Sequence, residues 1–167
     1  MEELQTQRLR ICAFDKRYLE DYALYLTEEI TRYQYPDPFA SLEDAEALLD
    51  GFLADMARGK MLELAVLSLD GTFLGAAEVF GLQEEKPELG LWLRADAHGQ
   101  GLGAEVMRAV LGWLKQQGYA ACMYEVDRRN AASIALVKKF GGRPVGFNEV
   151  KTPSGKQLLL ETYEIAL

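Results

Sequence analysis

The sequence contains few of the residues from which metal centres and disulfide frameworks are built. Its 167 residues include two cysteines, Cys12 and Cys122, and a single histidine, His98. The cysteines are far apart and have no metal-like spacing, and one histidine cannot form a multi-histidine centre. We therefore expect no metal site and no disulfide, and we expect a reduced, cytoplasmic protein.

Long apolar runs and an excess of basic residues are also missing. No segment approaches the roughly 18 consecutive apolar residues of a membrane helix, and the first residues are acidic and polar, unlike a signal peptide. The 18 lysines and arginines face 26 aspartates and glutamates, which gives a formal net charge of −8. Because a phosphate-backbone binder needs an electropositive face, we expect neither a nucleic acid nor a membrane as partner. An acidic surface instead attracts cations such as amines.

The overall composition is that of an ordinary globular protein. Hydrophobic residues make up 49% of the chain and charged residues 26%, which argues against disorder. The length suits one domain, and no repeat, low-complexity tract or linker divides the chain. We therefore expect residues 1–167 to form a single domain.

Hydrophobic periodicity predicts alternating groups of strands and helices. Polar residues that can cap helices stand at Asp15, Ser41 and Asn130, and an Asp-Gly pair at 70–71 marks a hairpin. The order is β-α-α-β-β-β-α-β-α-β-β, which favours an α+β (mixed α/β) fold. Strands are expected at 9–14, 62–69, 72–80, 88–93, 121–126, 145–150 and 157–165, and helices from Asp15 to about 30, at 41–59, at 101–117 and at 131–140.

A glycine-rich loop between an expected strand and an expected helix is the most informative segment. Three glycines within five positions let the backbone approach a ligand closely and adopt positive φ. The helix that follows offers unpaired N–H groups and the positive end of its dipole, which suit a diphosphate. The loop consists of His98, Gly99, Gln100, Gly101, Leu102 and Gly103.

Two other interpretations of this loop remain open. The spacing Gly99-x-Gly101-x-x-Ala104, with Glu125 about 20 residues later, matches the dinucleotide-binding fingerprint and indicates a nucleotide-dependent oxidoreductase. That fingerprint follows its strand directly, whereas residues 94–97 intervene here, and the chain has one β-α-β unit. Alternatively, the loop is a strand-to-helix turn that binds no ligand.

A second motif favours a third interpretation. Asn130, Ser133, Lys139 and Gly141 fit an N-x-x-[SA]-x-x-x-Y-x-K-x-G-F helix. Together with the R-G-x-G-[LI]-G/A-like loop, this helix resembles the GNAT superfamily of N-acetyltransferases. The resemblance spans nearly the whole chain, and segments 6–11 and 125–130 are similar to the RimJ/RimL-like branch. It implies a central, mostly antiparallel twisted sheet of six to seven strands, flanked by about four helices, with splayed strands at the cofactor cleft.

The resemblance implies that acetyl-CoA binds as cosubstrate. In this superfamily the loop holds the pyrophosphate, mainly through backbone N–H groups, and a splayed strand lets its backbone bond the pantetheine arm. The side chains of Leu91, Trp92 and Leu93 are expected in the core. Lys139 and Arg94 are candidates to face the phosphates, although both can equally be surface charges. The residues implied for cofactor binding are Leu91, Trp92, Leu93, His98, Gly99, Gln100, Gly101, Leu102, Gly103, Asn130, Ser133 and Lys139.

Three positions depart from the superfamily pattern. His98 stands where Arg or Gln is usual, and backbone binding of the pyrophosphate is expected to survive this change. Gly142 replaces a phenylalanine, which affects packing. Val137 replaces the tyrosine that often protonates the leaving thiolate, so the general acid must be another residue.

The implied reaction needs a base for the attacking ammonium and a proton donor for the thiolate. Glu88, at the start of a strand, and Glu78, a polar residue in an apolar run, are the candidate bases. Ser133 at the helix start is the candidate proton donor, with Tyr124 as the alternative. The acceptor is expected to contact the first two helices and the loops at 33–39 and 148–157.

We therefore predict acetyl transfer from acetyl-CoA to a primary amine by direct attack in a ternary complex. The acceptor is a protein N-terminal amine or a small amine, and the chain acts as a monomer or homodimer. Because the usual tyrosine is missing, a non-catalytic acyl-CoA-binding sensor with the same fold is the alternative.

Overall fold

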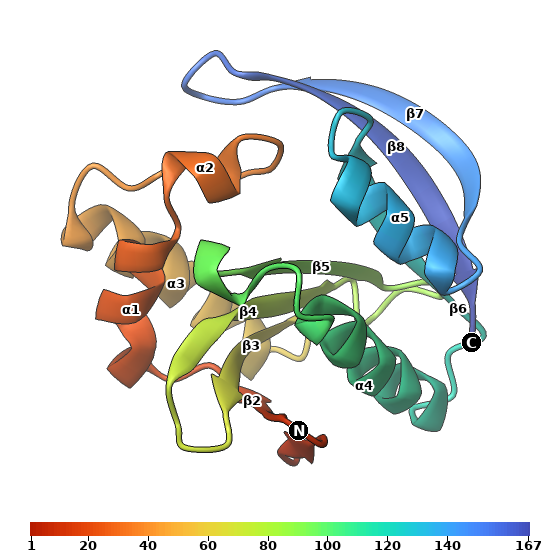
Figure 1. Ribbon diagram of the computed structural model, residues 1–167, viewed down its shortest axis with the longest axis horizontal. Helices are drawn as coiled ribbons and strands as arrows, with labels where there is room; N and C mark the ends of the chain where they lie inside the picture. The colour runs from red at the N-terminus through yellow and green to blue at the C-terminus, as the bar shows by residue number, and fades with distance from the viewer.

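Eight β-strands form one sheet in the computed structural model, which describes residues 1–167 (Figure 1). The strand order is β1-β2-β3-β4-β5-β6-β8-β7. Every neighbouring pair is antiparallel except β5 and β6, which are parallel. The strands are β1 (Leu4–Gln5), β2 (Leu9–Ala13), β3 (Leu62–Ser68), β4 (Phe73–Phe80), β5 (Glu88–Leu93), β6 (Ala121–Asp127), β7 (Arg143–Lys151) and β8 (Gln157–Ala166).

Five helices cover this sheet, and Figure 1 shows α1, α2 and α3 on one side of the molecule and α4 and α5 on the other. None of them combines the length and the apolar character needed to cross a bilayer. The helices are α1 (Leu19–Tyr25), α2 (Glu28–Thr31), α3 (Leu42–Ala57), α4 (Leu102–Gln116) and α5 (Ala131–Lys139), and two short 3-10 turns lie at Lys16–Tyr18 and Ala95–Ala97.

Alternating side chains of the strands build a separate core on each face of the sheet. Leu89 and Leu93 of β5 join the core under α4 and α5, which includes Val106 of α4 and Val137 of α5. Trp92, with the opposite orientation, joins the core under α1 and α3. The two faces of β5 therefore pack against different sets of helices. The expected α+β class is confirmed.

Three details differ from the sequence prediction. The sheet has eight strands instead of six to seven, because β1 adds a two-residue strand that pairs Leu4 with Ile11 and is too short to show alternation. The segment after Asp15 is not one helix: the chain leaves helical geometry at Leu26 (φ −80°, ψ 66°), and the Thr27 side chain caps a new helix, α2. Asp15 caps the 3-10 turn that precedes α1.

Strands β5 and β6 separate almost as soon as they meet. They share a single register pair, Glu88 with Met123, whereas β6 pairs with β8 from Ala121 to Asp127. The remaining length of β5 therefore has no ladder partner on its β6 side. This is the splay that the superfamily resemblance implied, and it opens toward the carboxyl end of β5.

Candidate active site

The glycine-rich loop takes a shape that only glycine adopts easily. Gly99 (φ 72°) and Gly101 (φ 75°) both lie in the left-handed region, and Gly101 is the N-cap of α4. None of the N–H groups from Gly99 to Ala104 donates a hydrogen bond within the protein. A run of free donors at a helix N-terminus suits an anion, so the loop fits the diphosphate of acetyl-CoA.

Side-chain hydrogen bonds from His98 and Arg8 hold this loop in place. His98 Nε2–H donates to the Leu93 carbonyl at 2.8 Å. Arg8 Nη1 donates to the Gln100 carbonyl at 2.9 Å, and Arg8 Nη2 lies 2.7 Å from Glu105 Oε2. Arg8 was missed as a site residue, because nothing in the sequence pattern links it to a loop about ninety residues away. Because its charge is paired with Glu105, Arg8 acts on the loop by fixing the Gln100 carbonyl.

The splayed edge of β5 lies beside this loop. The Arg94 N–H donates to Leu74 O of β4 at 2.8 Å, so the alternate residues Leu91 and Leu93 direct their backbone groups toward β6, where no strand pairs with them. The Trp92 side chain lies in the core, edge to face against Tyr22 with ring centroids 5.1 Å apart. As expected, the backbone groups of Leu91 and Leu93 are free to bind a ligand, and the Trp92 side chain lies in the core.

The loop, β5 and α5 converge at Gly103. A Cβ atom at Gly103 would lie 3.6 Å from Leu136 of α5 and 3.9 Å from Leu91 of β5. Leu102 is a core residue whose backbone N–H belongs to the free run of donors. Three elements from different parts of the chain therefore meet beside the free N–H groups of the loop.

A pair of hydroxyl groups lies at the start of α5. Asn130 Oδ1 accepts from the Ser133 N–H at 3.1 Å, which confirms the expected helix cap. Ser133 Oγ lies 2.9 Å from Tyr124 Oη of β6. Burial raises the pKa of Tyr124, the Ser133 hydrogen bond lowers it, and the charge of Glu78 raises it. Val137 is fully buried in the core, and the tyrosine hydroxyl that contacts the start of α5 is that of Tyr124.

Carboxyl groups occupy the opposite face of the sheet. Glu78 of β4 stands directly opposite Gly90 of β5 and Glu63 of β3. A Cβ atom at Gly90 would lie 2.9 Å from Glu78 Oε2, so the Glu78 carboxylate occupies the space that the glycine leaves. Burial raises the pKa of Glu78 to about 7. Glu63 was missed, although it interrupts an apolar run in the same way as Glu78.

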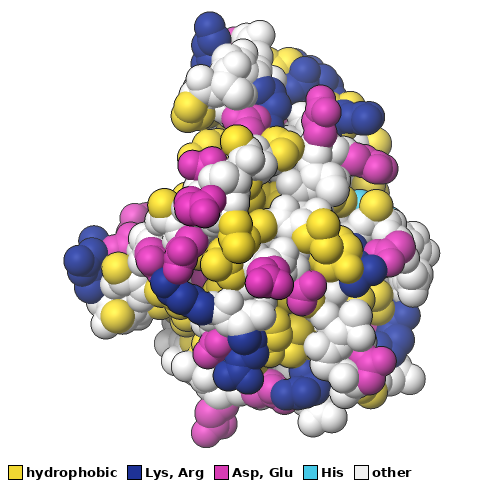
Figure 2. Space-filling view, turned by 90° about the vertical axis from the view of Figure 1, so that its left-hand side faces the viewer, with side chains coloured by type: hydrophobic (Ala, Val, Ile, Leu, Met, Phe, Trp, Pro, Cys, Tyr) yellow, Lys and Arg dark blue, Asp and Glu magenta, His cyan; other side chains and the backbone are white.

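Glu88 lies on this face too, but at the closed end of the splay, where β5 still pairs with β6. Burial raises its pKa to about 7, and the charges of Glu125 and Glu84 contribute. Glu63, Glu78, Glu88 and Glu125 form no ion pair, whereas Glu164 pairs with Lys86. The central strands therefore carry uncompensated acidic groups. On the surface over α1, α2 and α3, Figure 2 shows acidic and hydrophobic side chains adjoining one another, with Lys and Arg both on the upper lobe and lower down.

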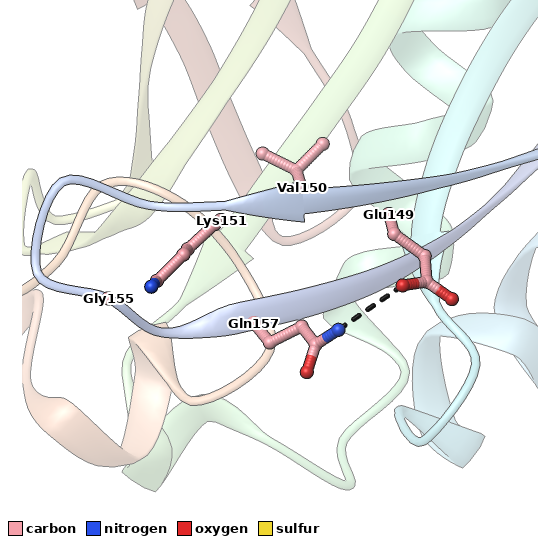
Figure 3. A pocket seen from close by; sticks show the side chains of 5 residues that line it. All are labelled: Glu149, Val150, Lys151, Gly155 and Gln157. Atoms are coloured by element: carbon pink, nitrogen blue, oxygen red, sulfur yellow. Dashed lines mark hydrogen bonds between the residues drawn. The ribbon is translucent and has the colours of Figure 1, made fainter.

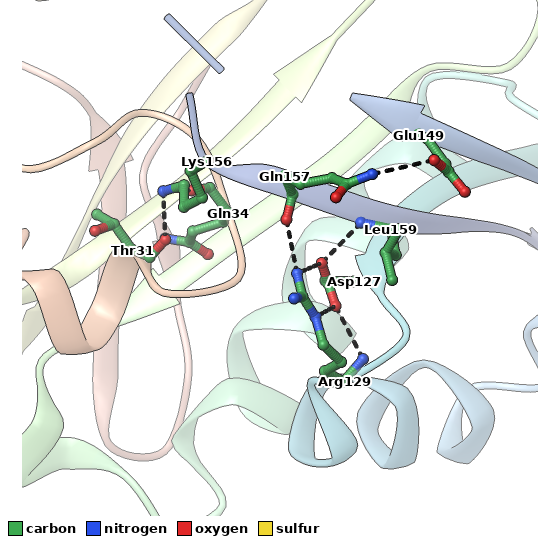
Figure 4. A network of polar contacts seen from close by, with 8 residues as sticks. All are labelled: Thr31, Gln34, Asp127, Arg129, Glu149, Lys156, Gln157 and Leu159. Carbon is green, nitrogen blue, oxygen red and sulfur yellow. Dashed lines mark hydrogen bonds and ion pairs between the residues drawn. The ribbon is translucent and has the colours of Figure 1, made fainter. Parts of the chain in front are cut away.

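The two loops expected to contact the acceptor meet through Lys156 (Figure 4). Lys156 Nζ donates to the carbonyls of Thr31 (2.8 Å) and Gln34 (2.7 Å) and lies 2.7 Å from Asp37 Oδ1. This joins the tip of the β7–β8 hairpin to the segment after α2. Next to it, the Arg129 guanidinium bonds buried Asp127 and the carbonyl of residue 157.

The side chains of Arg94 and Lys139 form no hydrogen bond or ion pair with the loop at 98–103, and one surface depression lies on the β7–β8 hairpin. Arg94 bonds Asp96 and Phe73 O and stacks over Tyr25 at 3.9 Å, so it faces α1 and not the loop. Lys139 is exposed on the last turn of α5 and forms no ion pair. A depression of about 490 Å³ lies on the hairpin (Figure 3), and its walls are polar apart from one valine. It is lined by Glu149, Val150, Lys151, Gly155 and Gln157.

Comparison with known proteins agrees with this geometry. The acetyltransferase (GNAT) domain family matches residues 8–143, whereas comparison with curated protein sequences gives no match. RimL, a ribosomal L7/L12 alpha-N-protein acetyltransferase solved with coenzyme A, is 17% identical, with a TM-score of 0.84 over 99% of this chain and 98% of its own. Spermidine N-acetyltransferase from Vibrio cholerae, solved with CoA and spermine, is 14% identical, with a TM-score of 0.82 over 96% of each chain.

A GNAT-family acetyltransferase from Bacillus anthracis is similar as well, at 18% identity and a TM-score of 0.81 over 99% of this chain and 98% of its own. At these identities the solved structures show a shared fold, and the family match covers most of the sequence. The family and the fold inferred from the loop at 98–103 and the helix at 131–140 are confirmed. This chain belongs to the GNAT family of acetyltransferases.

Proposed function

We propose that the protein transfers the acetyl group of acetyl-CoA to the primary amine of a positively charged acceptor, as a member of the RimJ/RimL-like branch. The likeness to RimL over nearly the full length of both chains supports the branch. The observation that carries the proposal is the placement of a carboxylate, Glu78, and a hydroxyl pair, Tyr124 and Ser133, on opposite faces of the splayed strands.

The N–H groups from Gly99 to Ala104 would hold the two phosphates, and Arg8, paired with Glu105, fixes the loop through the Gln100 carbonyl. The free backbone groups of Leu91 and Leu93 bond the amides of the pantetheine arm in the manner of a neighbouring strand. Acetyl-CoA supplies an activated thioester. The loop and the free edge of β5 would hold its phosphates and its pantetheine arm, which would orient the thioester for attack.

Glu78 is the general base. The acceptor arrives as an ammonium ion and must lose a proton before its nitrogen can attack. The Glu78 carboxylate, under Gly90, receives that proton. Since burial raises its pKa to about 7, Glu78 is ionised above that pH and protonated below it, so kcat/KM falls as the pH drops through about 7.

The hydroxyl pair of Tyr124 and Ser133 is the general acid. Ser133 Oγ, at the start of α5, gives its proton to the thiolate, and Tyr124 Oη, 2.9 Å away, supplies the replacement proton. This arrangement takes the place of the tyrosine that the family usually carries where this chain has Val137. The proton that leaves the amine nitrogen after attack replenishes the pair through solvent.

The uncompensated carboxyl groups favour a cationic acceptor. Glu78, Glu88 and Glu125 share one face and have no basic partner. The net charge of −8 adds long-range attraction for cations. The spermidine N-acetyltransferase with a similar fold was solved with spermine, a polycation. Glu88 is placed to hold the acceptor's positive charge, and Lys156 fixes the two loops that border it.

A thiol-release assay tests this function. The wild-type protein, supplied with acetyl-CoA and a panel of cationic and neutral amines, releases CoA with the cationic ones. Glu78→Gln lowers kcat by about 10²-fold or more and leaves acetyl-CoA affinity unchanged. The matched control is Glu85→Gln, at an exposed glutamate between β4 and β5, which retains wild-type kcat.

Three results contradict the proposal in different ways. Acetyl-CoA binding without thiol release across the panel indicates the non-catalytic sensor. Stabilisation by NAD(P) and not by acetyl-CoA in a thermal-shift comparison indicates the oxidoreductase. A loss of kcat in Glu88→Gln, with normal kcat in Glu78→Gln, identifies Glu88 as the general base in place of Glu78.

A further inference from the structure

Glu63 and Glu78 form a pair of carboxyl groups, of which Glu63 is fully buried and Glu78 half-buried. They are directly opposite one another on the antiparallel strands β3 and β4, and side chains in this relation have Cβ atoms about 4.5–5.5 Å apart. Glu63 is 0% exposed, and neither of its carboxyl oxygens has a hydrogen-bond partner. Neither residue forms an ion pair with a lysine or arginine.

The groups around this pair bring no positive charge. Tyr22 of α1 and Trp92 of β5 are buried here, and Tyr22 Oη and Trp92 Nε1 also have no partner. From α3, the buried Leu49 packs against this core. The titratable groups that sense the charge of Glu78 are Glu63, Tyr22 and, from β6, Tyr124, all of which are neutral acids when protonated. Glu88 is the next carboxyl group along this face.

Two adjacent carboxyl groups without a cation cannot both ionise in a buried site. Two ionised carboxylates are also both acceptors, so they cannot hydrogen-bond each other, whereas an acid and a carboxylate can. Burial and the charge of Glu78 both raise the pKa of Glu63 well above its usual value. Because Glu63 is fully buried whereas Glu78 is half-buried, Glu63 is the member that retains the proton, and Glu78, under Gly90, is the member that ionises.

We propose that Glu63 is a positioning residue for acetyl transfer: its protonated carboxyl group donates a hydrogen bond to the Glu78 carboxylate and holds it as the base that faces the acceptor. This inference rests on the proposed function for the role of Glu78. The buried pair carries one negative charge between two side chains before the acceptor binds.

The proton balance follows directly. An N–H bond of the acceptor ammonium breaks, its electron pair stays on nitrogen, and an O–H bond forms on Glu78. The pair then holds two protons and no charge, which is the form that burial favours. After the product leaves, Glu78 returns its proton to water, and Glu63 keeps its own throughout the cycle.

Two variants of Glu63 separate a positioning role from a packing role. Glu63→Gln keeps an N–H donor toward Glu78, so the acidic limb of its kcat/KM profile stays close to that of the wild type. Glu63→Leu has a similar volume but no donor, so Glu78 ionises less readily. The limb moves to higher pH by about one to two units, the shift expected from losing one hydrogen bond to a charged group. At high pH the kcat of Glu63→Leu recovers toward the wild-type value.

A packing role predicts a different result, because it lowers kcat or stability at every pH without moving the limb. Superimposable pH profiles of the wild type and Glu63→Leu therefore overturn the proposal. So does an equal shift in Glu63→Gln and Glu63→Leu, because the glutamine then fails to replace the donor.

Infrared spectroscopy detects the proton retained by Glu63 without any substrate. At pH 8 the wild type shows the carbonyl band of an un-ionised carboxylic acid, and this band is lost in Glu63→Gln but kept in Glu78→Gln and in the exposed control Glu85→Gln. A wild-type spectrum without the band overturns the inference even if Glu63→Leu does not fold. A protein that shows the band but acetylates no amine instead contradicts the proposed function.

Discussion

Gly90→Ala tests whether the Glu78 carboxylate must lie where the structure places it. The Cβ atom of alanine would lie 2.9 Å from Glu78 Oε2, whereas ordinary contacts begin at 3.4 Å. The carboxylate must therefore move by the difference, about 0.5 Å, or the strands must part by as much. Gly90 does not have positive φ, so alanine causes no backbone strain at this position.

The expected cost falls on catalysis and not on folding. A misplacement of about 1 Å can lower a rate by about 10²-fold, so half that displacement predicts a kcat about 10-fold lower. Acetyl-CoA affinity stays unchanged, because the cofactor is held by the loop and the other edge of β5. Stability changes little: alanine is favoured over glycine in a strand by about 0.5–1 kcal/mol, which offsets the crowding.

Steady-state kinetics at saturating acetyl-CoA, a cofactor titration and a thermal melt measure these three quantities. The matched control is Gly112→Ala on α4, where an added Cβ meets nothing within 4 Å, and its kcat equals that of the wild type. An unchanged kcat in Gly90→Ala, or a loss of acetyl-CoA affinity as large as the loss of kcat, refutes the placement of Glu78 beside the reacting atoms.

Three further predictions address the other parts of the site. Gly101→Val abolishes acetyl-CoA binding in calorimetry, because a β-branched side chain is strained at φ 75° and covers the free N–H groups; unchanged affinity places the diphosphate elsewhere. Ser133→Ala and Tyr124→Phe each lower kcat about 10-fold or more, and the double variant is no worse than the more impaired single one, because they act as one donor; additive losses contradict a shared proton path. Lys156→Met releases the tie to Asp37 and the segment after α2, so it raises the KM for the acceptor with little effect on acetyl-CoA affinity; an acceptor KM equal to that of the wild type shows that these loops do not shape the acceptor site.

The anion loop and the helix cap were readable from the sequence because both are local. Gly99 and Gly101 are neighbours of the helix that they begin, and their freedom at positive φ is a property of the residue itself. Asn130 caps α5 through a hydrogen bond to Ser133, three residues away. The end of α1 at Leu26 was missed because the helical spacing of apolar residues continues past it. Only the Thr27 cap marks the start of α2.

The partners of the catalytic groups come from strand register and long-range packing. Glu63 faces Glu78 because β3 and β4 pair in one particular register, and a slip of one residue would turn either side chain to the other face. Tyr124 reaches Ser133 because α5 packs on β6, and Arg8 reaches Gln100 across about ninety residues of chain. No single-sequence pattern records these distances.

By itself, then, the sequence determined which chemistry was available: a diphosphate loop, a capped helix beside it, and unpaired acidic residues in apolar strands, each specified by neighbours in the chain. The tertiary structure alone decided which groups work together. It placed Glu78 under Gly90 with Glu63 behind it, and it gave Ser133 a tyrosine from β6. The physical reason is that conformational preference acts between adjacent residues, whereas proton affinity and charge depend on whichever groups the complete fold buries together.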